Sequence, residues 1–279
     1  MMKKLFIACC LLGALHFDMS AQGLKVPAPS PTQTIKQDFA LSSIEITYSR
    51  PVVNGRKIFG DLVPYGKLWR TGANGATKIA FGEDVTIGGQ KVKAGEYALY
   101  TIPNAGEWEI ILNTGVKNGG VVGYKESEDV ARFKVKSNKL KAAVESFTIE
   151  VADVKSNTAT INIIWDKTSV GIPVSADIDG KIMAQIQENM KSDKPAYFQA
   201  GMYYVQSNKD LNQAITWFDK AIEQQPKAFY VYYQKAKALA ALGKKEEAKA
   251  TAQKSIELSK EAGNEDYVAL NEKLLATLK

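Results

Sequence analysis

Between residues 35 and 175 the chain consists of short β-rich runs separated by Gly and Pro. The run 44–48 alternates strictly, and the run 84–87 leads into the hairpin signal Gly88-Gly89. Similar runs occupy residues 78–81, 97–102, 108–112, 131–135, 146–151 and 159–165. Because strands with one buried face repeat every two residues, and because turns separate the runs regularly, the pattern predicts an antiparallel β-sandwich or barrel.

After residue 176 the spacing of apolar residues changes to the three-to-four period of a helix. A linker helix within 176–193 is predicted by Ile178, Ile182, Ile186 and Met190. Beyond it, residues 194–279 contain two units with a period of 34 residues, which is the length of a tetratricopeptide repeat. Each unit reads as helix, turn and helix, and a generic pair of helical hairpins is the alternative.

The two units match the repeat to different degrees. The first unit has the residue spacing that is typical of the second helix of a tetratricopeptide repeat, at Ala214, Phe218, Ala221 and Pro226. The second keeps Ala248 but has Ala252 and Ser255 where an aromatic residue and Ala are usual. Small residues at these places allow paired helices to approach closely. A final helix that covers the exposed end is predicted by Leu270, Leu274, Leu275 and Leu278.

The first 21 residues have the three-part pattern of a secretory signal peptide. Lys3 and Lys4 precede the apolar run 5–15, and Met19-Ser20-Ala21 stand before the expected cleavage point. The apolar run is too short to span a membrane, for which a helix needs roughly 20 residues. Residues 22–34 read as a Pro-rich linker. We therefore expect an exported protein, periplasmic or extracellular, with no transmembrane segment in the mature chain.

Export would remove every histidine and cysteine of the chain, since His16, Cys9 and Cys10 all lie in the expected signal peptide. Without them the mature chain can form no Ser-His-Asp or Cys-His triad and no zinc site of the usual kind. We therefore expect no catalytic residue, no metal and no cofactor, and favour a non-enzymatic protein. The formal net charge of +6 is spread along 279 residues, so a nucleic-acid partner is not expected.

Segment 49–77 departs from the strand-and-turn pattern and contains three of the four arginines of the chain. Arg is preferred to Lys where a carboxylate or phosphate is bound by two parallel hydrogen bonds. The candidate ligand-binding residues of this segment are Arg50, Arg56, Tyr65, Trp69, Arg70 and Asn74.

Two interpretations of these residues compete. In the first, the arginines bind an anionic small molecule or a glycan, and Trp69 or Tyr65 stacks against it. In the second, the arginines pair with Asp61, Glu83 or main-chain carbonyls, and Trp69 fills the core. The second ranks first, because aromatic side chains belong to a core more often than to a ligand site.

The same segment, SRPVVNGRKIFGDLVPYGKLWRTGANGAT, followed by DVTIGGQKVKAGEYALYTIP and EWEIILN, resembles domain-of-unknown-function family 2911. The resemblance covers roughly residues 27–172. It implies a β-sandwich-like domain and an exported location, and it implies no activity and no catalytic residues.

The expected fold class is α+β with several domains. An antiparallel β-sandwich-like domain (35–175) is followed by the linker helix (176–193) and by an all-α tetratricopeptide-like domain with a capping helix (194–279). The expected function is protein or peptide interaction in the cell envelope through the helical repeats, which could instead dock on the β domain. The alternative is a module that binds, or hydrolyses, a carbohydrate or anionic ligand at segment 49–77.

Overall fold

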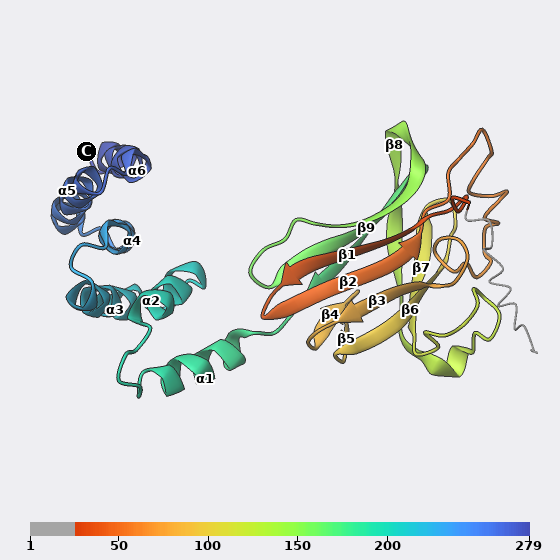
Figure 1. Ribbon diagram of the computed structural model, residues 1–279, viewed down its shortest axis with the longest axis horizontal. Helices are drawn as coiled ribbons and strands as arrows, with labels where there is room; N and C mark the ends of the chain where they lie inside the picture. The colour runs from red at the N-terminus through yellow and green to blue at the C-terminus, as the bar shows by residue number, and fades with distance from the viewer. Residues whose placement is uncertain (1–25) are drawn as a thin grey trace, which may run out of the picture. The chain divides into compact units, whose positions relative to one another are not determined.

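The computed structural model of the protein describes residues 26–279 and divides them into two units (Figure 1). A β unit ends at Ala176, and a helical unit comprises Asp177–Lys279. The signal peptide expected at 1–21 and residues 22–25 of the expected linker lie outside the described residues. No described helix is long and apolar enough to cross a membrane.

The described residues of the β unit form one antiparallel sheet of nine strands, in the order β1-β2-β3-β6-β7-β8-β9-β4-β5. The strands are β1 (Thr32–Phe39), β2 (Ser42–Ser49), β3 (Thr77–Phe81), β4 (Val85–Ile87), β5 (Gln90–Val92), β6 (Gly95–Ile102), β7 (Glu107–Asn113), β8 (Asp129–Ala152) and β9 (Thr158–Ser175). The first part of β8 pairs with β7, and the part from Ser137 onward pairs with β9. Strand β8, one of the long green strands of Figure 1, therefore carries the sheet from one layer into the other.

An aromatic cluster fills the space between the layers. Trp108 on β7 and Trp165 on β9 are almost fully buried, and Phe59 lies against both, with ring centroids 4.8 and 6.2 Å away. Trp69 stacks on Trp165 at 6.0 Å, with 14° between the ring planes. Each such pair adds about 0.5–1.5 kcal/mol beyond the burial of area. The expected sandwich-like fold is confirmed, with segment 49–77 contributing to its core.

Two strands, β8 and β1, differ from the sequence prediction. The runs 131–135 and 146–151 belong to the single strand β8, because the polar residues between them stay extended in pairing with β9. Strand β1 begins at Thr32, before the boundary expected at residue 35. Its sequence TQTIKQDF is polar because β1 is the edge strand beside β2 and most of its side chains are exposed or only half-buried.

The helical unit contains six helices among the described residues. They are α1 (Asp179–Asn189), α2 (Tyr197–Gln206), α3 (Leu211–Gln224), α4 (Phe229–Ala241), α5 (Lys245–Glu261) and α6 (Glu265–Thr277). Asp210 caps α3 by accepting from Asn212 N, and Asn264 caps α6 by accepting from Tyr267 N. Gly243 adopts a φ of 75° between α4 and α5, a left-handed conformation that glycine tolerates at the end of a helix.

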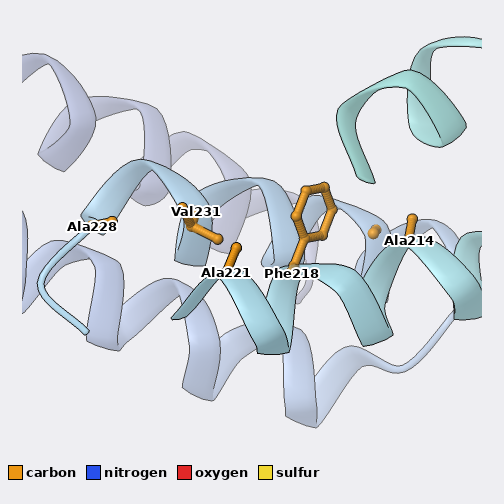
Figure 2. Close-up of a cluster of buried hydrophobic side chains, with 6 residues drawn as sticks. Ala214, Phe218, Ala221, Ala228 and Val231 are labelled. Carbon is orange, nitrogen blue, oxygen red and sulfur yellow. The ribbon is translucent and has the colours of Figure 1, made fainter. Parts of the chain in front are cut away.

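The small residues predicted for the repeats are buried where helices meet. Ala214, Phe218 and Ala221 on α3 form one cluster with Ala228 and Val231, the latter on α4 (Figure 2). In the second unit Ala248, Ala252 and Ser255 are fully buried. The α2/α3 and α4/α5 pairs followed by α6 confirm the predicted repeats and the final helix.

The buried face of α6 differs from the predicted one. Leu270 is 40% exposed, whereas Val268 and Asn271 are buried. The Asn271 side chain donates to Ser255 Oγ at 2.9 Å, and Ser255 Oγ donates to the carbonyl of Phe229 at 2.8 Å. A polar residue therefore occupies a core position of α6, while the predicted Leu278 is buried and Leu274 packs against its cluster, so the leucine pattern fails only at Leu270.

Candidate functional site

Segment 49–77 folds as a loop held against strand β6. Trp69 N donates to Thr101 O at 2.8 Å, and Thr101 N donates to Trp69 O at 2.9 Å. This bridge directs the indole ring into the aromatic cluster, where Trp69 Nε1 donates to Gly72 O at 3.1 Å. At Gly72, where φ is 151°, a Cβ would lie 3.1 Å from Ser49 O, so the loop passes close to the end of β2. Trp69 therefore packs in the core, as the second interpretation of segment 49–77 predicts.

The three arginines of the segment have separate surroundings. Arg50 is half-buried and donates from Nε to Phe147 O at 3.0 Å and from Nη2 to Thr148 Oγ1 at 3.1 Å. Arg56 is exposed and donates to the carbonyls of Val52 and Val53. The acceptors of both are therefore main-chain carbonyls or a hydroxyl, and no described contact joins one arginine to another.

Arg70 differs from the other arginines. It is half-buried, its Nε atom is buried without a hydrogen-bond partner, and no described residue forms an ion pair with it. A Cβ at Gly120 would lie 2.7 Å from its Nη1, so the guanidinium packs closely on that glycine.

Tyr65 and Asn74 complete the predicted set. Tyr65 is 44% exposed, and its ring covers Gly60, where a Cβ would come within 2.7 Å of it. Asn74 adopts a left-handed φ of 59° and donates to Ser30 O at 3.2 Å and to Ser49 Oγ at 3.1 Å. Asn74 thereby ties the residues before β1 to the loop.

Sequence reasoning missed the surroundings of the fourth arginine, Arg132 on β8. Its guanidinium contacts Asp129 Oδ2 at 2.8 Å and Glu109 Oε2 at 3.1 Å. It also donates to the Tyr124 hydroxyl, which in turn donates to Asp129. Burial, followed by the bond to Asp129, raises the pKa of Tyr124 to about 12. Asp129 and Tyr124 lie three and eight residues before Arg132, whereas Glu109 comes from β7, so only the pairing of β7 with β8 completes this network.

One predicted residue lines a cavity of the β unit. The cavity has a volume of about 300 Å³ between β1 and the last part of β8, and Arg50, Tyr48 and Lys36 are among its lining residues. That volume is at the lower end of the range found for small-ligand sites.

A larger cavity of about 530 Å³ lies in the helical unit, where sequence reasoning proposed no residue. Its lining includes the aromatic side chains Tyr197, Phe198 and Tyr230 and the amides of Gln199, Gln224 and Gln225. The aromatic residues at the start of α2 and α4 could have indicated this cavity from the sequence, because the repeat spacing does not assign them to core positions.

The aromatic side chains of this cavity continue as a row across three helices. The row runs from Phe198 on α2 to Tyr230 and Phe229 on α4, then to Tyr267 on α6, which also contacts Tyr233 on α4. The ring centroids of successive contacts lie 5.0–5.8 Å apart. All five side chains are half-buried, and the Lys237 ammonium lies 5.5 Å from the centre of the Tyr233 ring. We call these five residues the aromatic row.

The fold and these surfaces define a two-domain α+β protein in which an antiparallel β domain precedes helical repeats. Models of the tetratricopeptide repeat match residues 195–227 and 217–250, and such repeats suggest protein interaction in general. A model described as a protein of unknown function (DUF2911) matches residues 30–174, just over half of the chain. The chain belongs to this family, which confirms the resemblance seen in the sequence. No curated protein and no solved structure matches the chain.

Residues 26–279 contain no cluster of side chains that could bind a metal ion. No three or more His, Cys, Asp or Glu side chains in that range are placed to hold an ion.

Proposed function

We propose that the helical unit binds a peptide segment of a partner protein along the aromatic row, in the cell envelope. The observation that carries the proposal is the row itself: five half-buried aromatic side chains from three helices, ending at the 530 Å³ cavity. Aromatic side chains that are partly exposed supply large contact area at low entropic cost and dominate many interfaces.

The residues around the row suit a peptide backbone. Gln199, Gln224 and Gln225 combine donors and acceptors at the cavity, while Phe198 and Tyr230 offer apolar surface. Gln224 Nε2 already donates to Pro195 O at 3.2 Å, and Tyr230 donates to Gln225 Oε1 at 3.0 Å. Gln199 is exposed and no described hydrogen bond uses its amide, so both of its groups remain for a ligand.

A photo-crosslinking amino acid at Gln199 tests the proposal in the native cell. We expect a crosslinked peptide from a partner protein at this position, identified by mass spectrometry. The matched control replaces Gln253, which is exposed on α5 outside the row, and should give no such product. Tyr230→Ala should weaken the crosslink at Gln199 while circular dichroism still reports folded helices. Equal crosslinking at both positions, or no effect of Tyr230→Ala, would contradict the proposal.

We also propose that the protein is exported with its N-terminal segment removed. The support is the charged start at Lys3 and Lys4, the apolar run 5–15 and the small residues before Gln22. Mass spectrometry of the protein from its native cells should find a new N-terminus close to Gln22. An intact Met1 in the mature protein would contradict export by this route.

A further inference from the structure

Arg70 lies on the face of the sheet that is turned away from the aromatic cluster. The antiparallel bridge between Trp69 and Thr101 places Arg70 across from Tyr100 on strand β6. Because successive side chains of an extended chain point to opposite faces, and Trp69 points into the core, Arg70 and Tyr100 both point outward. Tyr100 belongs to a small buried cluster on that outer face, and half-buried Leu68 packs against it. Arg70 therefore stands beside this outer cluster, apart from the core of the sandwich.

The segment between β7 and β8 covers the outer cluster at residues 114–124, which we call the covering loop. The Tyr100 hydroxyl donates to Gly120 O at 2.9 Å, and the Tyr124 ring packs against the Tyr100 ring with 5.1 Å between centroids. Gly120 has a left-handed φ of 91°, and a Cβ there would lie 2.7 Å from Arg70 Nη1. The covering loop is therefore held by Tyr100 and meets the guanidinium at a glycine.

The Arg70 guanidinium has no acceptor among the described residues. Its Nε is buried without a hydrogen-bond partner, whereas its Nη1 and Nη2 are unbonded but still reach solvent. Polar groups that folding removes from water are almost always hydrogen-bonded, so this guanidinium calls for an acceptor that the described residues do not supply. A ligand can reach it from solvent at the two terminal nitrogens.

The acidic side chains that flank the covering loop are already paired with other basic residues. Arg132 shares the outer face, and it forms ion pairs of 2.8–3.9 Å with Asp129, Glu109 and Glu126. Lys125 pairs with the fourth of these acids, Glu128, at 3.0 Å. Lys117 in the covering loop is exposed and forms no described ion pair. The positive charge of Arg70 is therefore left uncompensated by its own chain.

The covering loop offers main-chain donors and apolar surface directly after Gly120. The N–H groups of Val121, Val122 and Gly123 donate to no described acceptor, and Tyr124 N closes this turn by donating to Val121 O at 3.3 Å. Successive free N–H groups in a turn are a common way for a main chain to bind an anion. The side chains of Val121 and Val122 are 42% and 77% exposed, so the same turn also presents apolar surface.

We propose that Arg70 and the covering loop bind a small ligand that combines a carboxylate with an apolar body, such as a medium-chain fatty acid. The carboxylate accepts two parallel hydrogen bonds from Nη1 and Nη2, which is the geometry that a guanidinium fork favours. The apolar body contacts Val121 and Val122, which an inorganic anion would leave without a partner. This site is separate from the aromatic row and does not depend on the function proposed for it.

Modification of arginines by phenylglyoxal, read residue by residue by mass spectrometry, tests the site in the wild-type full chain. We expect Arg70 to react in the free protein, because its terminal nitrogens reach solvent. Octanoate at about ten times its Kd should slow this reaction about tenfold. Arg56 is the internal control, since it is exposed and bonds only to carbonyls of its own loop, and octanoate should not change its rate. Neutral octanamide should protect neither arginine.

Two matched pairs of variants, titrated with octanoate by calorimetry, locate the site. Arg70→Lys keeps the charge but removes the parallel hydrogen bonds and should weaken binding about tenfold, whereas Arg56→Lys should leave it unchanged. Gly120→Ala places a methyl group against Nη1 and should weaken binding by a similar factor. Gly119→Ala should leave it unchanged, because no atom lies within 4 Å of its added Cβ. Melting temperatures show whether each variant retains the fold, and the phenylglyoxal test does not depend on any variant.

Several results would overturn the proposal. They are an Arg70 that is inert to phenylglyoxal in the free protein, no protection by octanoate, equal protection of Arg70 and Arg56, or full octanoate affinity in Arg70→Lys. Protection by inorganic phosphate as strong as that by octanoate would exclude the role of the apolar body. Tyr230→Ala alters the aromatic row and should bind octanoate like the wild type, so the failure of one site is distinguishable from the failure of the other.

Discussion

The contact between α2 and α3 provides the sharpest test of the helical unit. Gly201 is a buried glycine within α2, and a Cβ at this position would lie 2.7 Å from Phe218 Cε1 and 2.9 Å from Cδ1. Phe218 is fully buried beside Ala214 and Ala221 (Figure 2), so an added methyl group would have to displace its ring against these neighbours. We therefore expect Gly201→Ala to destabilise the protein, although Ala is the better helix former.

The magnitude follows from two opposing contributions. Overpacking a well-filled core costs about 1–3 kcal/mol, and two ring atoms closer than any real Cβ contact place this case near the upper value. Ala in a helix interior is favoured over Gly by about 1 kcal/mol. The net loss in the free energy of unfolding is therefore about 2 kcal/mol.

Urea denaturation followed by circular dichroism at the helical wavelengths measures this loss. Gly180→Ala is the matched control, because Gly180 lies in exposed α1 with no atom within 4 Å of an added Cβ. Gly180→Ala should leave the stability unchanged or raise it by up to about 1 kcal/mol, because Ala is the better helix former and meets no clash there. In the double variant Gly201→Ala with Phe218→Leu, the combined loss should be smaller than the sum of the single losses. A Gly201→Ala protein as stable as the wild type would refute the close packing inferred here.

Two further predictions concern the β unit. Arg50→Ala should lower the free energy of unfolding by about 1.5–3 kcal/mol, because it removes the hydrogen bonds of a half-buried charged group. Arg56→Ala should lower it by about 0.5 kcal/mol or less, because Arg56 is exposed. Equal losses in urea denaturation would contradict this prediction. The pKa of Tyr124, raised from 10.0 to about 12, means that the neutral phenol is favoured by the fold. Its stabilisation is present below pH 10 and is lost as pH rises towards 12. Tyr124→Phe should remove this part of the alkaline destabilisation, and ultraviolet absorbance of the tyrosines checks the titration.

Sequence patterns predicted the elements whose signal is local. Alternation over 44–48 marked strand β2, which carries a buried face at a period of two, and the apolar run 97–102 marked strand β6, which is buried on both faces. The spacing of Ala214, Phe218 and Ala221 marked the repeat, because small and aromatic residues recur where paired helices touch. Strand β1 escaped prediction because an edge strand with mostly polar, exposed side chains looks like a linker.

The candidate site could be predicted only as a set of residue types. Arg50, Arg56 and Arg70 stand close in sequence, and their shared chemistry suggested a common anion site. In the structure Arg50 bonds to β8, Arg56 bonds to its own loop, and Arg70 packs on Gly120. The contacts of Arg50 and Arg70 come from residues about 50 to 100 positions away, which no local pattern encodes.

By itself, therefore, the sequence determined the fold class, the two-part organisation and the family, because periodicity and motifs are properties of neighbouring residues. Only the tertiary structure decided that Trp69 belongs to the core, that five aromatic side chains form one row, and that β1 and β8 leave an opening beside Arg50. The physical reason is that burial, hydrogen-bond partners and cavities are set by contacts between segments, and these contacts exist only once the strands and helices have packed.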